Sequence, residues 1–181
     1  QVGGQPDINP LLASLVKHVQ QGGMHQADPQ AWSSLLLGLA HCNCSIDLTM
    51  SDGAGMDVQP VVAAAVEALQ GDTLHGATPE AVSNTFWALA VLGCKVGSNP
   101  NITSLLDSMM EHVQHGGMRQ ALPQDWSHLL WAAATLDAQA VDIHPLITAC
   151  CAAVVEGKFS KADPQEWSNV VWGLAKSRAD K

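Results

Sequence analysis

The segment ADPQEWSNVVWGLA (residues 162–175) decides the fold of this chain, because close copies of it occur three more times. ADPQAWSSLLLGLA (27–40), ATPEAVSNTFWALA (77–90) and ALPQDWSHLLWAAA (121–134) align with it without a gap. Each copy has alanine two residues before its proline, serine four after it and alanine eleven after it. The prolines, at positions 29, 79, 123 and 164, are 50, 44 and 41 residues apart, so similar units are joined by connectors of different length.

The sequence upstream of each copy repeats as well. An apolar run with helical periodicity comes first, and a segment that contains glycine follows it. The runs are 10–19, 60–69, 104–113 and 145–154. Each unit therefore predicts a helix A, a short linker and a helix B that begins at the proline. The apolar residues five before the prolines are expected to pin the linkers: Met24, Leu74, Met118 and Phe159.

The composition of the 181 residues agrees with a helical fold. The chain is rich in Ala, Leu and Val and has no Tyr, which favours helices over sheets. One helical pair of this size cannot bury its apolar faces alone, whereas four pairs stacked in series can. We therefore expect an all-α fold, an α-α superhelix (solenoid) of four helical-hairpin repeats with eight main helices. It forms a single domain over 1–181, with repeats at approximately 8–41, 58–92, 100–136 and 144–178.

The start of each helix B follows known capping rules. Asp28, Thr78 and Asp163 are expected as N-caps, with proline at the first helical position, where its missing N–H is not needed. Glu166 is placed to complete a capping box with Asp163. Leu122 cannot cap, so the third helix B is expected to start less firmly. The serine four residues after each proline is expected to donate a hydrogen bond to that proline's carbonyl.

Tryptophan occurs at two places in helix B, which we number from its proline as position 0. Position +3 is Trp32, Trp126 and Trp167, and it points into the broad apolar arc of the helix. Position +8 is Trp87, Trp131 and Trp172, and it lies at the edge of that arc. The +8 rings either pack against the neighbouring repeat or border a groove in which they stack on nucleic-acid bases.

Position +5 is polar in every repeat and changes identity: Ser34, Asn84, His128 and Asn169. It faces outward beside the +8 tryptophan. A position that is always polar yet varies suits a modular reader that recognises one base with each repeat. The alternative is a plain solvated helix face. Position +9 is always Gly or Ala, which allows close approach of a backbone or a ligand.

The charge is negative and uneven. The net charge is −9, of which residues 1–90 carry −7 and residues 91–181 carry −2. Five basic residues stand in the last 24 positions: Lys158, Lys161, Lys176, Arg178 and Lys181. A nucleic acid is therefore expected to prefer the C-terminal end.

The remaining patterns exclude several classes of protein. The longest apolar stretches are far shorter than the ~20 residues that span a bilayer, so no membrane insertion is expected. The five cysteines form no CxxC pair, and HCNC (41–44) lacks a second ligand pair, so we expect no disulfide framework and no metal site. We find no pairing of nucleophile with base and no phosphate-binding loop. The chain is therefore not expected to be an enzyme or to need a cofactor. Because it begins with Gln, we expect a processed protein or an excised fragment.

The repeated core resembles the octotricopeptide repeat, a degenerate unit of about 38 residues with a PPPEW-like core that is best known in green algae. Here that core is DPQAW (28–32), TPEAV (78–82), LPQDW (122–126) and DPQEW (163–167). The resemblance implies a superhelix of helical pairs that binds single-stranded RNA. It also implies a role in organellar gene expression, through stabilisation, processing or translation of transcripts, in the chloroplast or alternatively the mitochondrion.

The family's variable polar positions fall on Ser34, Asn84, His128 and Asn169 of this chain. The basic residues Arg119, Lys161, Lys176 and Arg178 complete the expected RNA-binding set. Helix A offers further candidates in Lys17, His18, Glu111 and His112.

A protein–protein interaction scaffold remains the alternative, because solenoids of this size serve both purposes and the acidic balance suits protein partners. A structural part of a larger ribonucleoprotein would combine the two roles, with organellar protein or ribonucleoprotein partners. Self-association through uncapped ends of the array is also open.

Overall fold

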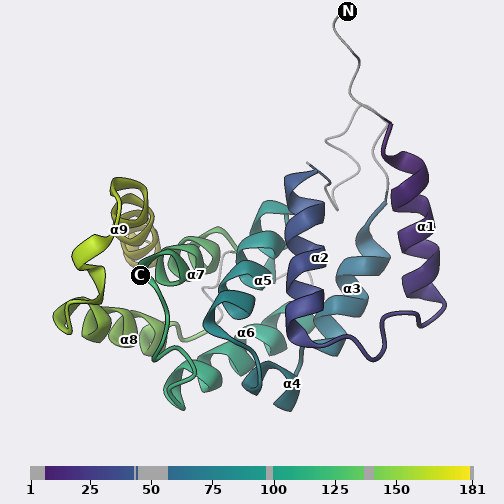
Figure 1. Ribbon diagram of the computed structural model, residues 1–181. Coiled ribbons are helices and arrows are strands. Elements are labelled where there is room, and N and C mark those ends of the chain that lie inside the picture. The colour runs from purple at the N-terminus through teal and green to yellow at the C-terminus, as the bar shows by residue number, and fades with distance from the viewer. Residues whose placement is uncertain (1–6, 43, 45–56, 97–99, 137–140, 180–181) are drawn as a thin grey trace, which may run out of the picture.

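The computed structural model describes residues 7–42, 44, 57–96, 100–136 and 141–179. Within these ranges the regular structure is entirely helical, which confirms the all-α class (Figure 1). The long helices are α1 (Asn9–Gln20), α2 (Pro29–His41), α3 (Gln59–Ala68), α5 (Pro79–Val91), α6 (Pro100–Gln114), α7 (Pro123–Thr135), α8 (His144–Val155) and α9 (Pro164–Ala179). They are the eight expected helices. Two short ones, α4 (Asp72–His75) and η3 (Lys158–Lys161), lie in linkers.

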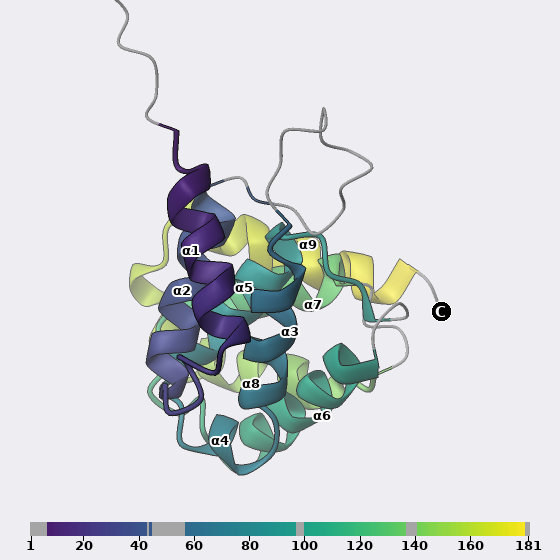
Figure 2. The ribbon, with the colours of Figure 1, turned by 90° about the vertical axis from the view of Figure 1, so that its right-hand side faces the viewer.

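The long helices form two rows. The A helices contact one another in chain order, α1 with α3, α3 with α6 and α6 with α8. The B helices do the same, α2 with α5, α5 with α7 and α7 with α9. Figures 1 and 2 show the two rows side by side, with α1 and α2 at one end and α8 and α9 at the other. Equivalent residues of successive repeats therefore come to lie in lines across each row.

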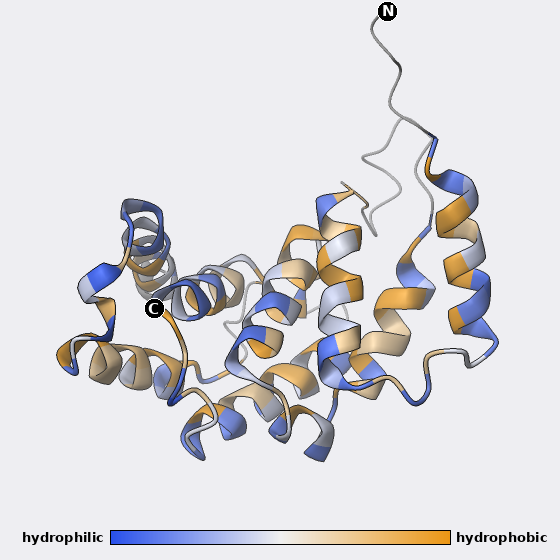
Figure 3. Cartoon of the chain, viewed as in Figure 1, coloured by the Kyte–Doolittle hydropathy of each residue, from blue (hydrophilic) through white to orange (hydrophobic). Residues whose placement is uncertain are grey.

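The core lies between the rows and between successive repeats. Position +3 of helix B is buried as Trp32, Val82 and Trp126, and the next apolar position, +7, is buried as Leu36 and Phe86. Figure 3 shows hydrophobic and hydrophilic residues alternating around the turns of α1, as expected of an amphipathic helix. None of the described helices has the length and apolar character needed to cross a membrane.

The linkers turn at glycine and are held by one apolar side chain. Gly22, Gly116 and Gly157 each stand seven residues before a proline and have φ of 80°. This left-handed conformation costs a side chain strain that glycine avoids. In the last three repeats the residue five before the proline is buried, as expected: Leu74, Met118 and Phe159.

The helix caps follow the sequence except in the third repeat. Asp28 Oδ1 accepts a hydrogen bond from the N–H of Ala31 at 2.8 Å. Thr78 Oγ1 accepts one from the N–H of Ala81, the equivalent residue of the second repeat. Asp163 and Glu166 form the expected capping box, with donor–acceptor distances of 2.8 and 2.7 Å.

In the third repeat the cap comes from inside the helix. Leu122 has no polar side chain, but Oδ2 of Asp125 accepts a hydrogen bond from the Leu122 N–H at 2.8 Å. The sequence did not predict this bond, because a leucine at the N-cap has no polar side chain and the acceptor lies three residues later, inside the helix.

The shared serine donates to its proline carbonyl in only one described repeat, where Ser168 Oγ lies 2.7 Å from Pro164 O. Ser127 donates instead to the carbonyl three residues back. Ser83 Oγ lies 3.0 Å from the Glu80 carbonyl and 3.0 Å from Oδ1 of Asp125, and donates to one of them at a time. The expected bond was therefore wrong for Ser83 and Ser127, and also for Ser33, whose buried Oγ has no hydrogen-bond partner among the described residues. Asp125 links the second repeat to the third through a buried contact.

The small residue at position +9 lets successive B helices approach closely. Ala88 and Ala132 are fully buried at the contacts of α5 with α2 and of α7 with α5. At Gly173 a methyl group would lie 2.7 Å from the carbonyl oxygen of Leu130 on α7. Among the described residues no B helix precedes α2, and a methyl group at Gly38 would meet nothing within 4 Å.

Replacing Gly173 with alanine should therefore destabilise the fold by about 1–3 kcal/mol, because α9 must move away from the backbone of α7. Gly38→Ala is the matched control. It should stabilise the fold by about 0.5–1 kcal/mol, because alanine favours helix and no atom opposes the methyl group. Urea unfolding followed by circular dichroism measures both changes. A stabilising Gly173→Ala would contradict the close approach.

Candidate functional site

The +8 tryptophans form a continuous row across three helices. Trp87 of α5, Trp131 of α7 and Trp172 of α9 follow one another with ring centroids 6.5 and 6.3 Å apart. Their rings are inclined by only 36° and 32°. The row exists because each tryptophan occupies the same position on helices packed side by side. We call Trp87, Trp131 and Trp172 the tryptophan ladder.

The two tryptophan positions differ in exposure. Trp32 and Trp126, at position +3, are each 2 % exposed and belong to the core. Of the ladder, Trp87 and Trp131 are half-buried, and Trp172 is 45 % exposed. Position +8 therefore packs between repeats, as one of the two alternatives predicts, and also presents part of its ring to solvent. Stacking on bases stays a prediction.

Imidazole rings from the neighbouring repeats contact the first ring of the ladder. His128, at position +5 of α7, stacks on Trp87 with centroids 5.6 Å apart and an interplanar angle of 30°. His41, at position +12 of α2, lies 5.5 Å from the same ring. The +5 side chain of one repeat thus lies against the +8 ring of the preceding repeat, a relation that no single repeat reveals.

His128 is held in its neutral form. Burial lowers the pKa of His128 below its ordinary value, and the carboxylates of Asp125 and Glu166 oppose this only in part. Its Nδ1 atom is buried and has no hydrogen-bond partner among the described residues. Near neutral pH this side chain therefore supplies an aromatic face and a polar ring atom without a positive charge.

The other +5 residues lie on the same side of the B row, which places the expected column beside the ladder. Ser34 is exposed on α2, and Asn84 and Asn169 are half-buried on α5 and α9. Gln165 Nε2 donates to Oδ1 of Asn169 at 2.9 Å.

The basic residues divide between two places. Lys176 is exposed on α9, seven residues after Asn169 and therefore on the same side of that helix. Lys161 is exposed in η3, before the other end of α9, and Arg119 is exposed in the linker before α7. Lys158 contacts Glu156 at 3.0 Å and donates to the Arg119 carbonyl at 2.9 Å. The side chain of Arg178, and all of Lys181, lie outside the described residues.

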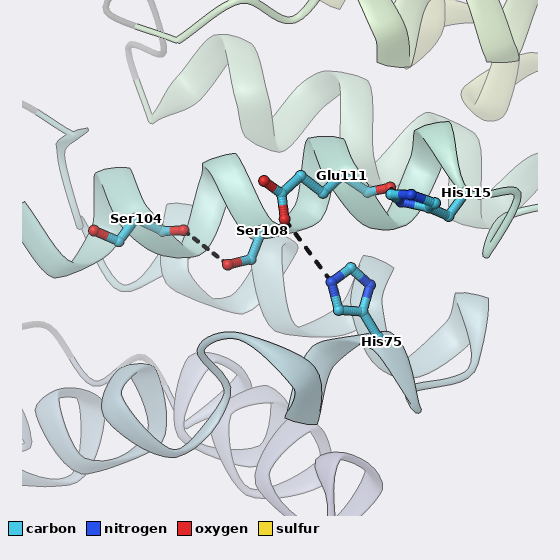
Figure 4. A network of polar contacts seen from close by, with 5 residues as sticks. All are labelled: His75, Ser104, Ser108, Glu111 and His115. Atoms are coloured by element: carbon cyan, nitrogen blue, oxygen red, sulfur yellow. Dashed lines mark hydrogen bonds and ion pairs between the residues drawn. The ribbon is translucent and has the colours of Figure 1, made fainter.

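A histidine cluster lies away from the ladder, between α4 and α6 (Figure 4). Asp72, His75, His112, His115 and Gly117 line an open cavity of about 400 Å³. The ring of His75 lies 6.0 Å from each of the other two histidine rings, and its Nε2 is 3.9 Å from a carboxylate oxygen of Glu111. Within the described ranges, no three His, Cys, Asp or Glu side chains are placed to hold a metal ion.

His112 is the buried member of this cluster. Its ring packs against Gly117, where a methyl group would lie 2.1 Å from Nε2. Burial, and then the neighbouring His75 and His115, lower the pKa of His112. Since the side chain is buried, the helix A candidate His112 is part of the packing between linker and helix. The cluster was not predicted from the sequence, because His75 belongs to the second repeat whereas His112 and His115 belong to the third.

No protein-family model, curated protein or solved structure matches this chain.

The two tryptophan positions should respond differently to truncation. Trp126→Ala removes a buried ring and should cost about 3–5 kcal/mol of unfolding free energy. Trp172→Ala removes a ring that is nearly half exposed and should cost about 1 kcal/mol. Urea unfolding of both variants tests this. Equal losses would mean that the ladder is ordinary core.

The stability of the fold should fall on acidification through His112. Because its folded-state pKa is lowered from the ordinary 6.5, the unfolded chain binds this proton more readily than the folded one. The free energy of unfolding is therefore highest above the unfolded pKa and falls as the pH drops below it, by about 1.4 kcal/mol for each unit of difference in pKa. Denaturant unfolding at about pH 8 and about pH 5.5, for the native chain and for His112→Gln, measures this. The variant should lose less stability between the two pH values, and an identical loss would exclude His112 as the source.

Proposed function

We propose that this chain is a single-stranded RNA-binding module in which the tryptophan ladder stacks on unpaired bases. One observation carries the proposal: a row of partly exposed tryptophans, inclined to one another by 36° and 32°, runs beside a row of polar side chains that differ from repeat to repeat. Stacking on an aromatic ring contributes about 1–3 kcal/mol per base and accepts any base. The varied polar side chains would then supply the preference among bases.

The dimensions of the ladder suit bases. Two bases stacked on each other are ~3.4 Å apart, so one base inserted between two rings needs a separation of about 7 Å. The ring centroids of the ladder are 6.5 and 6.3 Å apart. Because the rings are inclined by 36° and 32°, a base would enter between two of them only if successive repeats moved apart and the rings turned towards parallel.

The contact of His128 with Trp87 suggests how one base would be read. A base on the Trp87 ring would meet the +5 side chain of the following repeat, because that side chain already lies against the ring. By the same relation a base on Trp131 would meet Asn169. Each reading unit would thus take its ring from one repeat and its polar group from the next.

The charges set the expected salt dependence. The chain has a net charge of −9, and Lys176 is the described lysine on the side of the +5 column. Few phosphates would be neutralised, so the affinity would come mainly from stacking and would depend only weakly on salt. Arg119 and Lys161, near the linkers, would steer the RNA backbone at the C-terminal end.

The finer assignments are part of the same proposal. The two rows of helices suit an α-α solenoid of four repeats that coils into a superhelix, of the octotricopeptide kind. The proposed targets are organellar transcripts, in the chloroplast or alternatively the mitochondrion, whose stability, processing or translation the protein would control. A protein-binding scaffold is the second candidate, favoured by the exposed apolar side chains at both ends of the rows.

Binding to a randomised single-stranded RNA pool tests the proposal, at about 50 and about 200 mM salt. Trp172→Ala should weaken binding by about 1–3 kcal/mol, since it removes one stacking ring. Trp167→Ala is the matched control, because Trp167 is on the same helix and 39 % exposed but lies outside the ladder. Its binding should equal that of the native chain.

Selection from the same pool tests the reading column. The triple variant Asn84/His128/Asn169→Ala should retain affinity but lose or change the selected motif. A motif unchanged in this variant would place the reading groups elsewhere. Absence of binding by the native chain at the lower salt would overturn the proposal in favour of the scaffold.

A further inference from the structure

The α8–α9 end of the molecule exposes apolar side chains at positions that are buried in the two middle repeats. Trp167 is 39 % exposed and Val171 is 60 % exposed. At the same two positions the earlier repeats have buried residues: Trp32, Val82 and Trp126 at +3, and Leu36, Phe86 and Leu130 at +7. On α8, Cys151 is exposed where Val66 and Met110 are buried. We call Ile147, Cys151, Trp167, Val171 and Leu174 the tail face.

The α1–α2 end shows the complementary pattern. Leu11 on α1 is 71 % exposed, whereas its equivalents Val61, Leu105 and Leu146 are fully buried. On α2, Gly38 is exposed, whereas the equivalent Ala88, Ala132 and Gly173 are buried against the preceding helix. We call Leu11, Leu15, Ala31, Leu35 and Gly38 the head face.

The two faces are the two halves of one kind of interface. Inside the fold, position +9 of one B helix lies against position +7 of the preceding one, as Gly173 does against Leu130, and positions +3 and +7 are buried in the first three B helices. The tail face carries positions +3 and +7, open at α9, and the head face carries position +9, open at α2. We propose that the tail face of one copy of this chain binds the head face of a second copy, so that copies associate head to tail.

The close contact at position +9 explains why the faces fit. Gly173 lies against the backbone of Leu130, which is the +7 residue of the preceding helix. In the proposed contact, Gly38 of the second copy takes the place of Gly173, and Val171 takes the place of Leu130. A Gly38 without any neighbour within 4 Å leaves room for this approach.

Charge favours the same arrangement. Residues 7–42, which contain the head face, hold two acidic residues and one basic residue, whereas residues 144–179, which contain the tail face, hold four basic and three acidic residues. Opposite charges at the two ends attract in a head-to-tail contact, whereas two tail faces repel each other.

The contact is heterologous, because it joins two different faces. Association therefore does not stop at two copies and gives a series of oligomers that grows with concentration. The row of B helices would continue from α9 of one copy to α2 of the next.

Sedimentation velocity of three variants tests the proposal. Gly38→Arg blocks the head face and Val171→Glu blocks the tail face. Both positions are exposed, so both variants should fold. Each alone should be monomeric, with self-association about a hundredfold weaker than in the native chain. Leu122→Glu is the control with the same introduced charge, since Leu122 is exposed outside both faces, and it should associate as the native chain does.

Mixing the two blocked variants distinguishes head-to-tail binding from other modes. The Gly38→Arg chain keeps a native tail face and the Val171→Glu chain keeps a native head face, so the mixture should form dimers of one copy each and nothing larger. A native chain that stays monomeric at all concentrations would overturn the proposal. So would a dimer that persists in Gly38→Arg alone, which indicates tail-to-tail contact, or a mixture that stays monomeric.

Discussion

Close packing between successive B helices is the constraint on which the rest of the structure depends. It requires a small residue at position +9, because the backbone of the preceding helix occupies the space that a larger side chain would need. At Gly173 even a methyl group would come within 2.7 Å of the Leu130 carbonyl oxygen. Alanine suffices at positions 88 and 132, which are fully buried. With this spacing, equivalent positions on neighbouring helices come into contact, so the equivalent residues of successive repeats lie in a row.

The tryptophan ladder follows directly from that spacing. Rings on helices about 8–10 Å apart can reach each other only if they share the same height and side of their helices. The gap-free alignment gives the tryptophans the same position in their helices, and the packing of those helices places the ring centroids of Trp131 and Trp172 6.3 Å apart. A wider helix packing would separate the rings, and a closer one would exclude any ligand between them. The structural requirement at +9 and the proposed binding property at +8 are therefore two consequences of one packing distance.

Much of this could be predicted from the sequence, because it depends on local rules that each repeat states again. Helix starts at Pro29 and Pro164, the cap at Asp28 and the buried linker residue Met118 all follow from residues a few positions apart. The contact of Ser83 with Asp125 and the cluster around His75 were not foreseen, since each joins residues of different repeats. Predicting them needs the distance and rotation between repeats, which connectors of unequal length do not reveal. The same limit hid the relation of His128 to Trp87, although both positions were noted.

The same helix position is buried in an inner repeat and exposed in an outer one. The burial of a side chain therefore depends on the neighbouring helices as well as on its place in its own helix. Leu36 and Val171 have the same place in their helices, yet the first is fully buried and the second is 60 % exposed. The difference cannot come from their own helix; it comes from the presence or absence of a following one. Neighbouring helices cover the internal faces, so these faces stabilise the fold and are not accessible to a partner. The outward faces of α2 and α9 keep the unused half of the same interaction. Under the proposed head-to-tail association, a fold built by repeating one interface would offer that same interface to a second copy at these two faces.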